Sequence, residues 1–153
     1  MQETSIKKVK MSQIRTIGDD VLRNTSDQVT VFDSSIDDLY TEMSTAMYEN
    51  AGVGLAAPQI GISKKVIVID DNKTACMMIN PQITWWSIEK VNFNEGCLSV
   101  PGQHGVISRP RSIKVKFQTK KGKFKHWKLD GLKARVVQHE IDHLKGILFV
   151  DYL

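Results

Sequence analysis

The stretch Gln138-His139-Glu140-Ile141-Asp142-His143 decides how the rest of this sequence is interpreted. On a helix that turns about 100° per residue, His139, Glu140 and His143 fall within one arc of roughly 100°. Two imidazoles one turn apart can bind the same metal ion, and the carboxylate beside the first can reach a water molecule bound to that ion. The motif also arises by chance on solvated helices, so a metal site requires at least one further ligand.

The further ligand has to come from upstream of this motif. Only ten residues follow His143, and Asp151 is the only one of them with a metal-ligating side chain. Asp151 lies beyond Gly146 and an apolar run, so we expect it to cap or pair with another group rather than to coordinate. The upstream candidates are His104, His126, Cys76, Cys97 and Glu95.

Cys97 is the best of these candidates. His126 alternates with lysines on a predicted exposed hairpin, and Cys76 lies inside an apolar strand, so both are expected to be structural. Cys97 follows Gly96 in a segment rich in small residues and turn formers, where a thiolate can point into a cleft. One thiolate and two imidazoles leave the fourth position of a tetrahedral ion to water, which is the arrangement of a catalytic rather than a structural site.

Two helices are predicted. Hydrophobic periodicity predicts one over residues 35–49 with Ser34 or Ser35 as N-cap. The capping residues Asp130 and Gly146 predict the other, over residues 131–145. This order of elements predicts an α+β fold, with antiparallel β-sheets packed around a central helix that carries His-Glu-x-x-His. Short apolar or alternating runs predict strands at 65–70, 77–80, 83–88, 113–117 and 124–129, the last two forming a hairpin.

Length and composition predict one soluble domain over residues 11–153, preceded by a flexible N-terminal extension over residues 1–10. The start of the chain has no apolar segment typical of a secretory signal, and no run approaches the ~20 apolar residues that span a membrane. We therefore expect a cytosolic protein, in a bacterium or a host cell, that has no membrane partner. In that compartment Cys76 and Cys97 are expected as free thiols.

Seven lysines lie within residues 114–128, in a chain with a net charge of +4. The favoured interpretation is a solvated face that also protects exposed strand edges. Docking to RNA or to the ribosome is compatible with this charge, but the run shows no series of stacking aromatic residues. The segment 52–59 is rich in small residues, and its glycine spacing fits neither phosphate-binding loop, which excludes a nucleotide site there.

Three segments together resemble the motifs of the peptide deformylases, in the same order and at similar spacing. They are Gly52-Val53-Gly54-Leu55-Ala56-Ala57-Pro58-Gln59, Glu95-Gly96-Cys97-Leu98-Ser99 and Gln138-His139-Glu140-Ile141-Asp142-His143. The resemblance extends from about Gln13 to the end of the chain. It implies an enzyme that removes the formyl group from N-formylmethionine of nascent peptides and releases formate.

The resemblance also implies a role for each matching residue. Cys97, His139 and His143 would hold one divalent ion, with Fe²⁺ as the native metal and Zn²⁺, Ni²⁺ or Co²⁺ as substitutes, and a metal-bound water would be the nucleophile with Glu140 as general base. The oxygen of the formyl group would be stabilised by the metal, the Gln59 amide and the Leu98 backbone N–H. The peptide backbone would contact Val53, Gly54 and Gly96. Glu95, Asp142 and Arg109 are candidates to orient the ligands, or to form surface salt bridges instead.

Three features differ from many bacterial members. The sequence stops at Leu153 without their C-terminal helix and so resembles the short forms carried by some bacteriophages and organelle-type relatives, which leaves ribosome contact open. His104 stands where many members have an arginine near the substrate. Arg135 occupies an often apolar position, so either its stem packs in the methionine pocket with its head in water, or the pocket differs. Two other hypotheses are a small metallopeptidase and an RNA- or ribosome-binding module with a structural metal; no DNA partner is expected.

Overall fold

The computed structural model describes residues 12–153, so the predicted extension over residues 1–10 lies outside the described residues. The predicted α+β class with antiparallel sheets is confirmed. The helices and 3-10 turns are η1 (Asp20–Arg23), α1 (Ser34–Glu49), η2 (Ala57–Ile60), α2 (Gly131–Leu144) and η3 (Phe149–Tyr152). The strands are β1 (Gly54–Ala56), β2 (Val66–Asp71), β3 (Thr74–Trp86), β4 (Lys90–Cys97), β5 (Val100–Pro110), β6 (Ser112–Gln118) and β7 (Phe124–Asp130).

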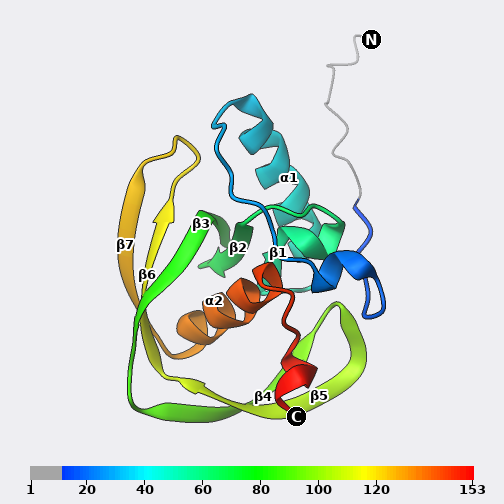
Figure 1. The fold of residues 1–153 in the computed structure, drawn as a ribbon, viewed down its shortest axis with the longest axis vertical. Helices are drawn as coiled ribbons and strands as arrows, with labels where there is room; N and C mark the ends of the chain where they lie inside the picture. The colour runs from blue at the N-terminus through cyan, green and yellow to red at the C-terminus, as the bar shows by residue number, and fades with distance from the viewer. Residues whose placement is uncertain (1–11) are drawn as a thin grey trace.

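Two antiparallel sheets surround α2. Five strands form one sheet in the order β1-β2-β3-β6-β7, and β4 and β5 form a separate two-stranded ribbon. In Figure 1, α2 lies between the large sheet and the β4–β5 ribbon, while α1 lies at the opposite end of the molecule from the ribbon. The C-terminal η3 contacts both strands of the ribbon. The ribbon and α2 therefore come together at one side of the core.

Strand β2 is buried on both faces, which explains its continuous apolar run. Val66 and Val68 pack in a cluster with Met43 and Met47 of α1. The alternate residues of β2, including Ile67, pack in a second cluster with the apolar face of α2. Because successive side chains of a strand point to opposite faces, one strand anchors both helices.

Helix α1 begins one residue earlier than predicted, and its N-cap differs. Asp33, rather than Ser34 or Ser35, is the N-cap, and its carboxylate accepts a hydrogen bond of 2.9 Å from the Ser35 backbone N–H. Asp130 occupies the N-cap position of α2 as predicted, but its side chain accepts from the Ser112 hydroxyl instead of capping the helix. Gly146 follows α2 with a φ of +75°, a conformation that favours glycine.

The predicted break between strands at Pro81 is wrong. β3 is continuous through Pro81, with register shifts against β6 on its C-terminal side. Asn80 adopts a φ of +51°, and its side-chain amide bonds the Val29 backbone at 2.8 Å and the Gln118 side chain at 2.8 Å. These bonds stabilise the irregular backbone, so the strand continues past the proline.

Strands β1, β4 and β5 are absent from the sequence-based prediction. The sequence of β5 contains prolines and glycines, and its register with β4 is regular from Lys90–Pro110 to Gly96–His104. Both cysteines are free, as expected. Over residues 12–153, no helix has the length and apolar character needed to cross a membrane.

Candidate metal centre

Three metal-ligating side chains converge where the end of β4 meets α2. The ligand atoms of Cys97, His139 and His143 lie within 4.8 Å of one another, and no other such group of three occurs among residues 12–153. Cys97 ends β4, and α2 presents the two histidines one turn apart. The structure thus brings together the thiol and the two imidazoles that the sequence predicted as ligands.

The ring of His139 is oriented by Glu95. Its Nδ1 lies 2.9 Å from Glu95 Oε1, which leaves Nε2 as the nitrogen available for a ligand bond. Burial opposes ionisation of the Glu95 carboxyl, but hydrogen bonds from His139 and Arg109 outweigh it and lower its pKa to about 2. Burial lowers the pKa of His139, but Cys97 and Glu95 raise it to about 10. A metal ion bound by His139 would therefore displace a proton from this imidazole.

Arg109 connects Glu95 to Asp142 in a buried network. Its guanidinium donates to Glu95 at 2.7 and 3.0 Å and to Asp142 at 2.8 Å, and its side chain is 6% exposed. Tyr152 also donates to Asp142, at 2.8 Å. Glu95, Asp142 and Arg109 therefore form a buried network and not the surface salt bridges that were the alternative.

His143 is buried and held beside the thiol. Its Nε2 lies 3.3 Å from Cys97 Sγ. Burial and the nearby positive charge of His139 lower its pKa to about 3, so the imidazole stays neutral, which is the form that binds a metal. Its Nδ1 is buried without a hydrogen-bond partner among the described residues.

Glu140 carries a buried carboxyl close to His143. It is 5% exposed, and its Oε1 lies 4.0 Å from His143 Nε2 and lacks a hydrogen-bond partner among residues 12–153. Burial raises its pKa to about 7. A Cβ on Gly54 would lie 2.6 Å from Glu140 Oε2, so only glycine at this position leaves room for the carboxyl. A carboxyl with a pKa near neutrality is suited to accept and return a proton.

Gln59 approaches the thiol from η2 with a fixed orientation. Its Oε1 accepts from the Ala56 backbone N–H at 2.9 Å, which directs Nε2 towards Cys97 Sγ at 3.6 Å and Ser99 Oγ at 3.1 Å. The side chain is 2% exposed. Leu98 follows Cys97 and lines the cavity that opens beside these groups. Ser99 was missed from sequence, because nothing in the linear pattern shows that it contacts Gln59.

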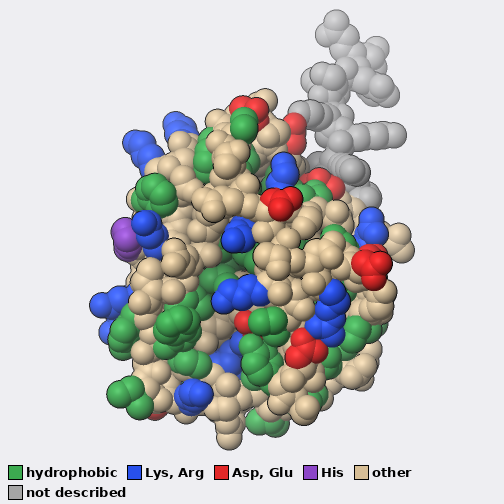
Figure 2. All heavy atoms as spheres, in the orientation of Figure 1, with side chains coloured by type: hydrophobic (Ala, Val, Ile, Leu, Met, Phe, Trp, Pro, Cys, Tyr) green, Lys and Arg blue, Asp and Glu red, His purple; other side chains and the backbone are tan. Residues whose placement is uncertain are grey.

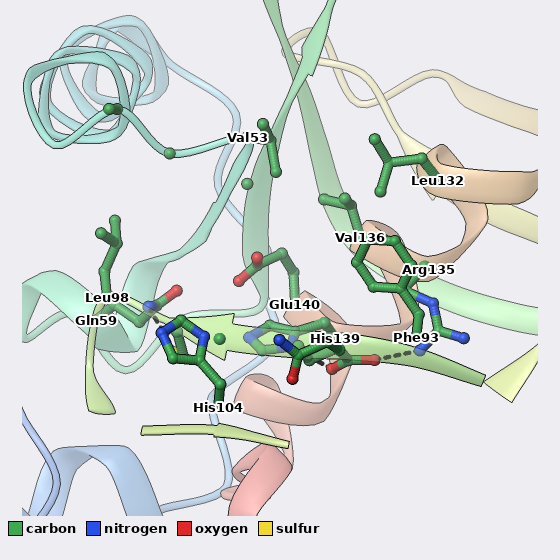
Figure 3. A pocket seen from close by; sticks show the side chains of 17 residues that line it. Val53, Gln59, Phe93, Leu98, His104, Leu132, Arg135, Val136, His139 and Glu140 are labelled. Atoms are coloured by element: carbon green, nitrogen blue, oxygen red, sulfur yellow. Dashed lines mark hydrogen bonds and ion pairs between the residues drawn. The ribbon is translucent and has the colours of Figure 1, made fainter. Parts of the chain in front are cut away.

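A cavity of about 380 Å³ opens beside these groups. The predicted substrate-contacting residues Val53, Gly54 and Gly96 all line it. Figure 3 shows Glu140 and His139 on α2 with Gln59 and Leu98 opposite them. The apolar wall of the cavity also includes Phe93, Leu132 and Val136, which were not predicted from the sequence. Helical spacing to His139 could have indicated Leu132 and Val136.

His104 and Arg135, the two positions left open from sequence, both line the cavity. His104 is exposed and covers Gly96, where a Cβ would lie 2.8 Å from the His104 Nδ1. The idea that the head of Arg135 reaches water is wrong. Arg135 is 7% exposed, and its guanidinium donates to Glu95 at 2.5 Å and to the backbone carbonyls of Ile107 at 3.1 Å and Val91 at 2.5 Å.

The donor set fits a divalent metal ion. Tetrahedral ligand bonds of about 2.0–2.3 Å place two donors of one ion roughly 3.3–3.8 Å apart. Cys97 Sγ and His143 Nε2 lie 3.3 Å apart, which matches this spacing. One thiol and two imidazoles suit Fe²⁺, Co²⁺, Ni²⁺ or Zn²⁺. The buried network of Glu95 and its partners supplies the support that ligand histidines usually have.

Comparisons with known proteins agree with this arrangement. The family model described as polypeptide deformylase matches residues 11–153. A curated peptide deformylase of Prochlorococcus marinus (strain MIT 9312) is 48% identical over 144 residues, covering 91% of this chain and 72% of the relative. The crystal structure of a probable peptide deformylase from Synechococcus phage S-SSM7 is 58% identical, with a TM-score of 0.91, and the match covers 93% of this chain and 99% of that one. A Met-Ala-Ser-bound structure of a class I type b peptide deformylase from Acinetobacter baumannii is 35% identical, with a TM-score of 0.90, covering 95% of this chain and 100% of that one.

Proposed function

The chain belongs to the polypeptide deformylase family and is a hydrolase, and from this premise we propose that it is a metal-dependent enzyme that removes the formyl group from N-formylmethionine of nascent peptides. The observation that carries the proposal is the convergence of three metal-ligating side chains, one buried carboxyl and one oriented amide on a single cavity. Because its substrates are fresh products of translation, we place the enzyme in the cytosol.

Cys97, His139 and His143 would hold the ion. A bound divalent metal lowers the pKa of water towards neutrality and polarises a carbonyl group. The donor set accepts several divalent ions, and we propose Fe²⁺ as the native one, with Zn²⁺, Ni²⁺ or Co²⁺ as substitutes. The contact between His139 Nδ1 and Glu95 would leave Nε2 as the nitrogen that binds the ion.

Glu140 moves the proton. Its Oε1 is free of hydrogen bonds within the described part of the chain, and its pKa of about 7 lets it take a proton from the attacking water at neutral pH. The same carboxyl then returns the proton to the departing amine. Since burial raises this pKa, the protein itself tunes the group for both steps.

Gln59 and the Leu98 backbone N–H stabilise the negative charge that develops on the formyl oxygen. The bond from Ala56 to Gln59 Oε1 fixes the amide before substrate arrives, so little reorganisation is needed. Loss of one donor of this kind costs about 3 kcal/mol of barrier, or about 100-fold in kcat.

The substrate would enter the 380 Å³ cavity with its methionine side chain against the apolar wall. A Met-Ala-Ser tripeptide is bound in the Acinetobacter baumannii structure, which supports a peptide N-terminus as ligand here. Val53, Gly54 and Gly96 would contact the peptide backbone, since a glycine allows close approach of another chain.

The decisive experiment measures formate release from a formyl-Met-Ala-Ser peptide by the metal-loaded protein, with unformylated Met-Ala-Ser as the comparison. We expect formate from the first peptide and no cleavage of the second. No formate with Fe²⁺, Ni²⁺ or Co²⁺ bound would refute the proposal, and cleavage of the unformylated peptide would indicate a metallopeptidase instead.

Two variants test the assigned roles. Glu140→Gln should retain the metal and lose turnover, while the matched change at an exposed position, Glu89→Gln, should leave turnover unchanged. Near-full activity of the first variant would remove Glu140 as the base. Cys97→Ser should lose metal and activity together, and metal retained at wild-type affinity would argue against Cys97 as a ligand.

A further inference from the structure

The outward face of the large sheet carries lysines in contact with aromatic rings. Strand pairing places Lys114 opposite Lys128 and opposite Trp85 of β3. The ammonium groups of Lys114 and Lys128 lie 5.6 and 5.7 Å from the Trp85 ring centre, and that of Lys116 lies 4.6 Å from the Phe124 ring centre. Trp85 is 40% exposed and Phe124 60% exposed. The alternate residues of β6 are buried in the core, so this set faces away from it.

The positive charge of the molecule is concentrated in this hairpin. Residues 112–129 contain seven lysines and neither Asp nor Glu. Because the whole chain carries +4 and this segment +7, the rest of the chain carries −3. Figure 2 shows Lys and Arg side chains along the left edge of the molecule, where Figure 1 places β7. A polyanion would therefore be attracted to this face rather than to the molecule as a whole.

A cavity of about 620 Å³ lies next to this face, at the irregular pairing of β3 with β6. It is lined by lysines, amide side chains and two aromatic residues, and no acidic residue is among the lining residues. Its volume lies in the range of small-molecule sites. It shares no lining residue with the 380 Å³ cavity of the metal centre, so it is a separate feature. The lysines that line it are Lys65, Lys116 and Lys145.

We propose that this face and its cavity bind single-stranded RNA. Phosphates would pair with Lys114, Lys116 and Lys128, and bases would stack on Trp85 and Phe124. The cavity would take one unstacked nucleotide. A basic surface with interleaved aromatic rings is the recognised platform for single strands, because every base has a face that stacks and every linkage carries a negative charge.

Strand pairing supplies the aromatic series that the hairpin sequence lacks. Trp85 lies in β3, far from the lysine run in sequence, and pairing with β6 places its ring within 6 Å of the ammonium groups of Lys114 and Lys128. The choice of RNA over other polyanions rests on the proposed function, since a nascent peptide is made beside RNA. The charge and stacking argument does not depend on that function.

The test is a titration of a fluorescein-labelled 12-nucleotide single-stranded RNA with the full chain, followed by anisotropy at several salt concentrations. Charge reversal at the face should weaken binding at least tenfold and lessen the slope of log K against log salt by about 2, since each phosphate contact on a single strand contributes about 0.7. Charge reversal at three exposed lysines elsewhere should change the affinity by less than about twofold. The face variant is Lys114→Glu/Lys116→Glu/Lys128→Glu, and the control is Lys64→Glu/Lys73→Glu/Lys90→Glu.

Two alanine variants test the role of the aromatic residues. Trp85→Ala and Phe124→Ala should each weaken RNA binding about 5- to 150-fold, the range expected when one stacked base loses its ring. Binding of inorganic polyphosphate of equal charge should be weaker than binding of RNA and should not respond to these two changes.

Four outcomes would overturn the proposal. They are no RNA binding at low salt, an equal loss in the control variant, unchanged affinity in both alanine variants, and polyphosphate binding as tight as RNA binding. Formate release by the lysine and aromatic variants should equal that of the wild type, which also shows that they fold. RNA binding without formate release would refute the proposed enzyme function and leave this inference standing.

Discussion

Replacing Arg135 with methionine tests whether the buried charge network stabilises the metal centre. Methionine preserves much of the apolar stem and removes the guanidinium. In the structure this group donates to Glu95 and to two backbone carbonyls from β4 and β5. The change therefore leaves three acceptors without this donor, at a position that is 7% exposed.

The expected cost follows from these contacts. Removing one partner of a buried ion pair typically costs about 3–5 kcal/mol of folding free energy. Arg109 still donates twice to Glu95 in the variant, which places the expected loss near the lower end, at about 3 kcal/mol. A domain of this size usually has about 5–15 kcal/mol in total, so the variant should fold. Since Glu95 also orients His139, metal affinity should fall by about 10- to 100-fold.

Urea unfolding at pH 7 measures the stability, and competition with a chelator measures the metal affinity. The matched control is Arg111→Met, because Arg111 pairs with Glu89 at 3.5 Å on the surface and is 56% exposed. Such a pair contributes at most about 1 kcal/mol. Arg135→Lys should recover part of the loss, since lysine restores the charge but not the forked geometry. A loss of stability at Arg135 no greater than that at Arg111, with unchanged metal affinity, would show that the buried network does not stabilise this site.

Three further predictions concern the same site. Gly54→Ala should lose most turnover while keeping its metal, because the new Cβ would displace the Glu140 carboxyl, and metal analysis beside a formate assay checks this. The pKa of Glu95 is lowered to about 2, so the stability that its ionised form contributes is present above pH 4.5 and is lost as the pH falls towards 2. The free energy of unfolding in urea should therefore differ more between pH 7 and pH 3 in the wild type than in Glu95→Gln, by at most about 3 kcal/mol. Chelator treatment should lower the Tm, and stoichiometric Zn²⁺ should restore it, whereas an unchanged Tm would mean that the site binds no ion in the folded state.

Local pattern was enough to predict most of the elements. The apolar residues of both helices recur at helical spacing, and the lysines of the β6–β7 hairpin alternate with buried residues, so each segment identifies its own conformation. β5 failed this test because its prolines and glycines give no alternating pattern. Its conformation comes from pairing with β4, which is a contact between segments.

The candidate site likewise has residues that local sequence predicts and residues whose contacts depend on the fold. The spacing of His139, Glu140 and His143 requires only a helix to bring them together, and the small residues around Cys97 marked an accessible thiol. The partners of Arg135 were not predictable, because Glu95 is 40 positions away and reaches it only when β4 packs on α2. A long cationic side chain normally keeps its head in water, and only a buried carboxylate brought by the fold changes that preference.

Residue types at short range and the chemistry of single side chains were enough to predict the His-Glu-x-x-His helix, the choice of Cys97 as the candidate third ligand, the fold class and the lysine-rich hairpin. Three features depend on the tertiary fold instead: Gly54 leaves room for Glu140, Arg135 is buried against Glu95, and Trp85 lies among the hairpin lysines. These contacts join residues far apart in sequence, and they form because strand pairing and core packing, rather than local preference, fix the distance between them.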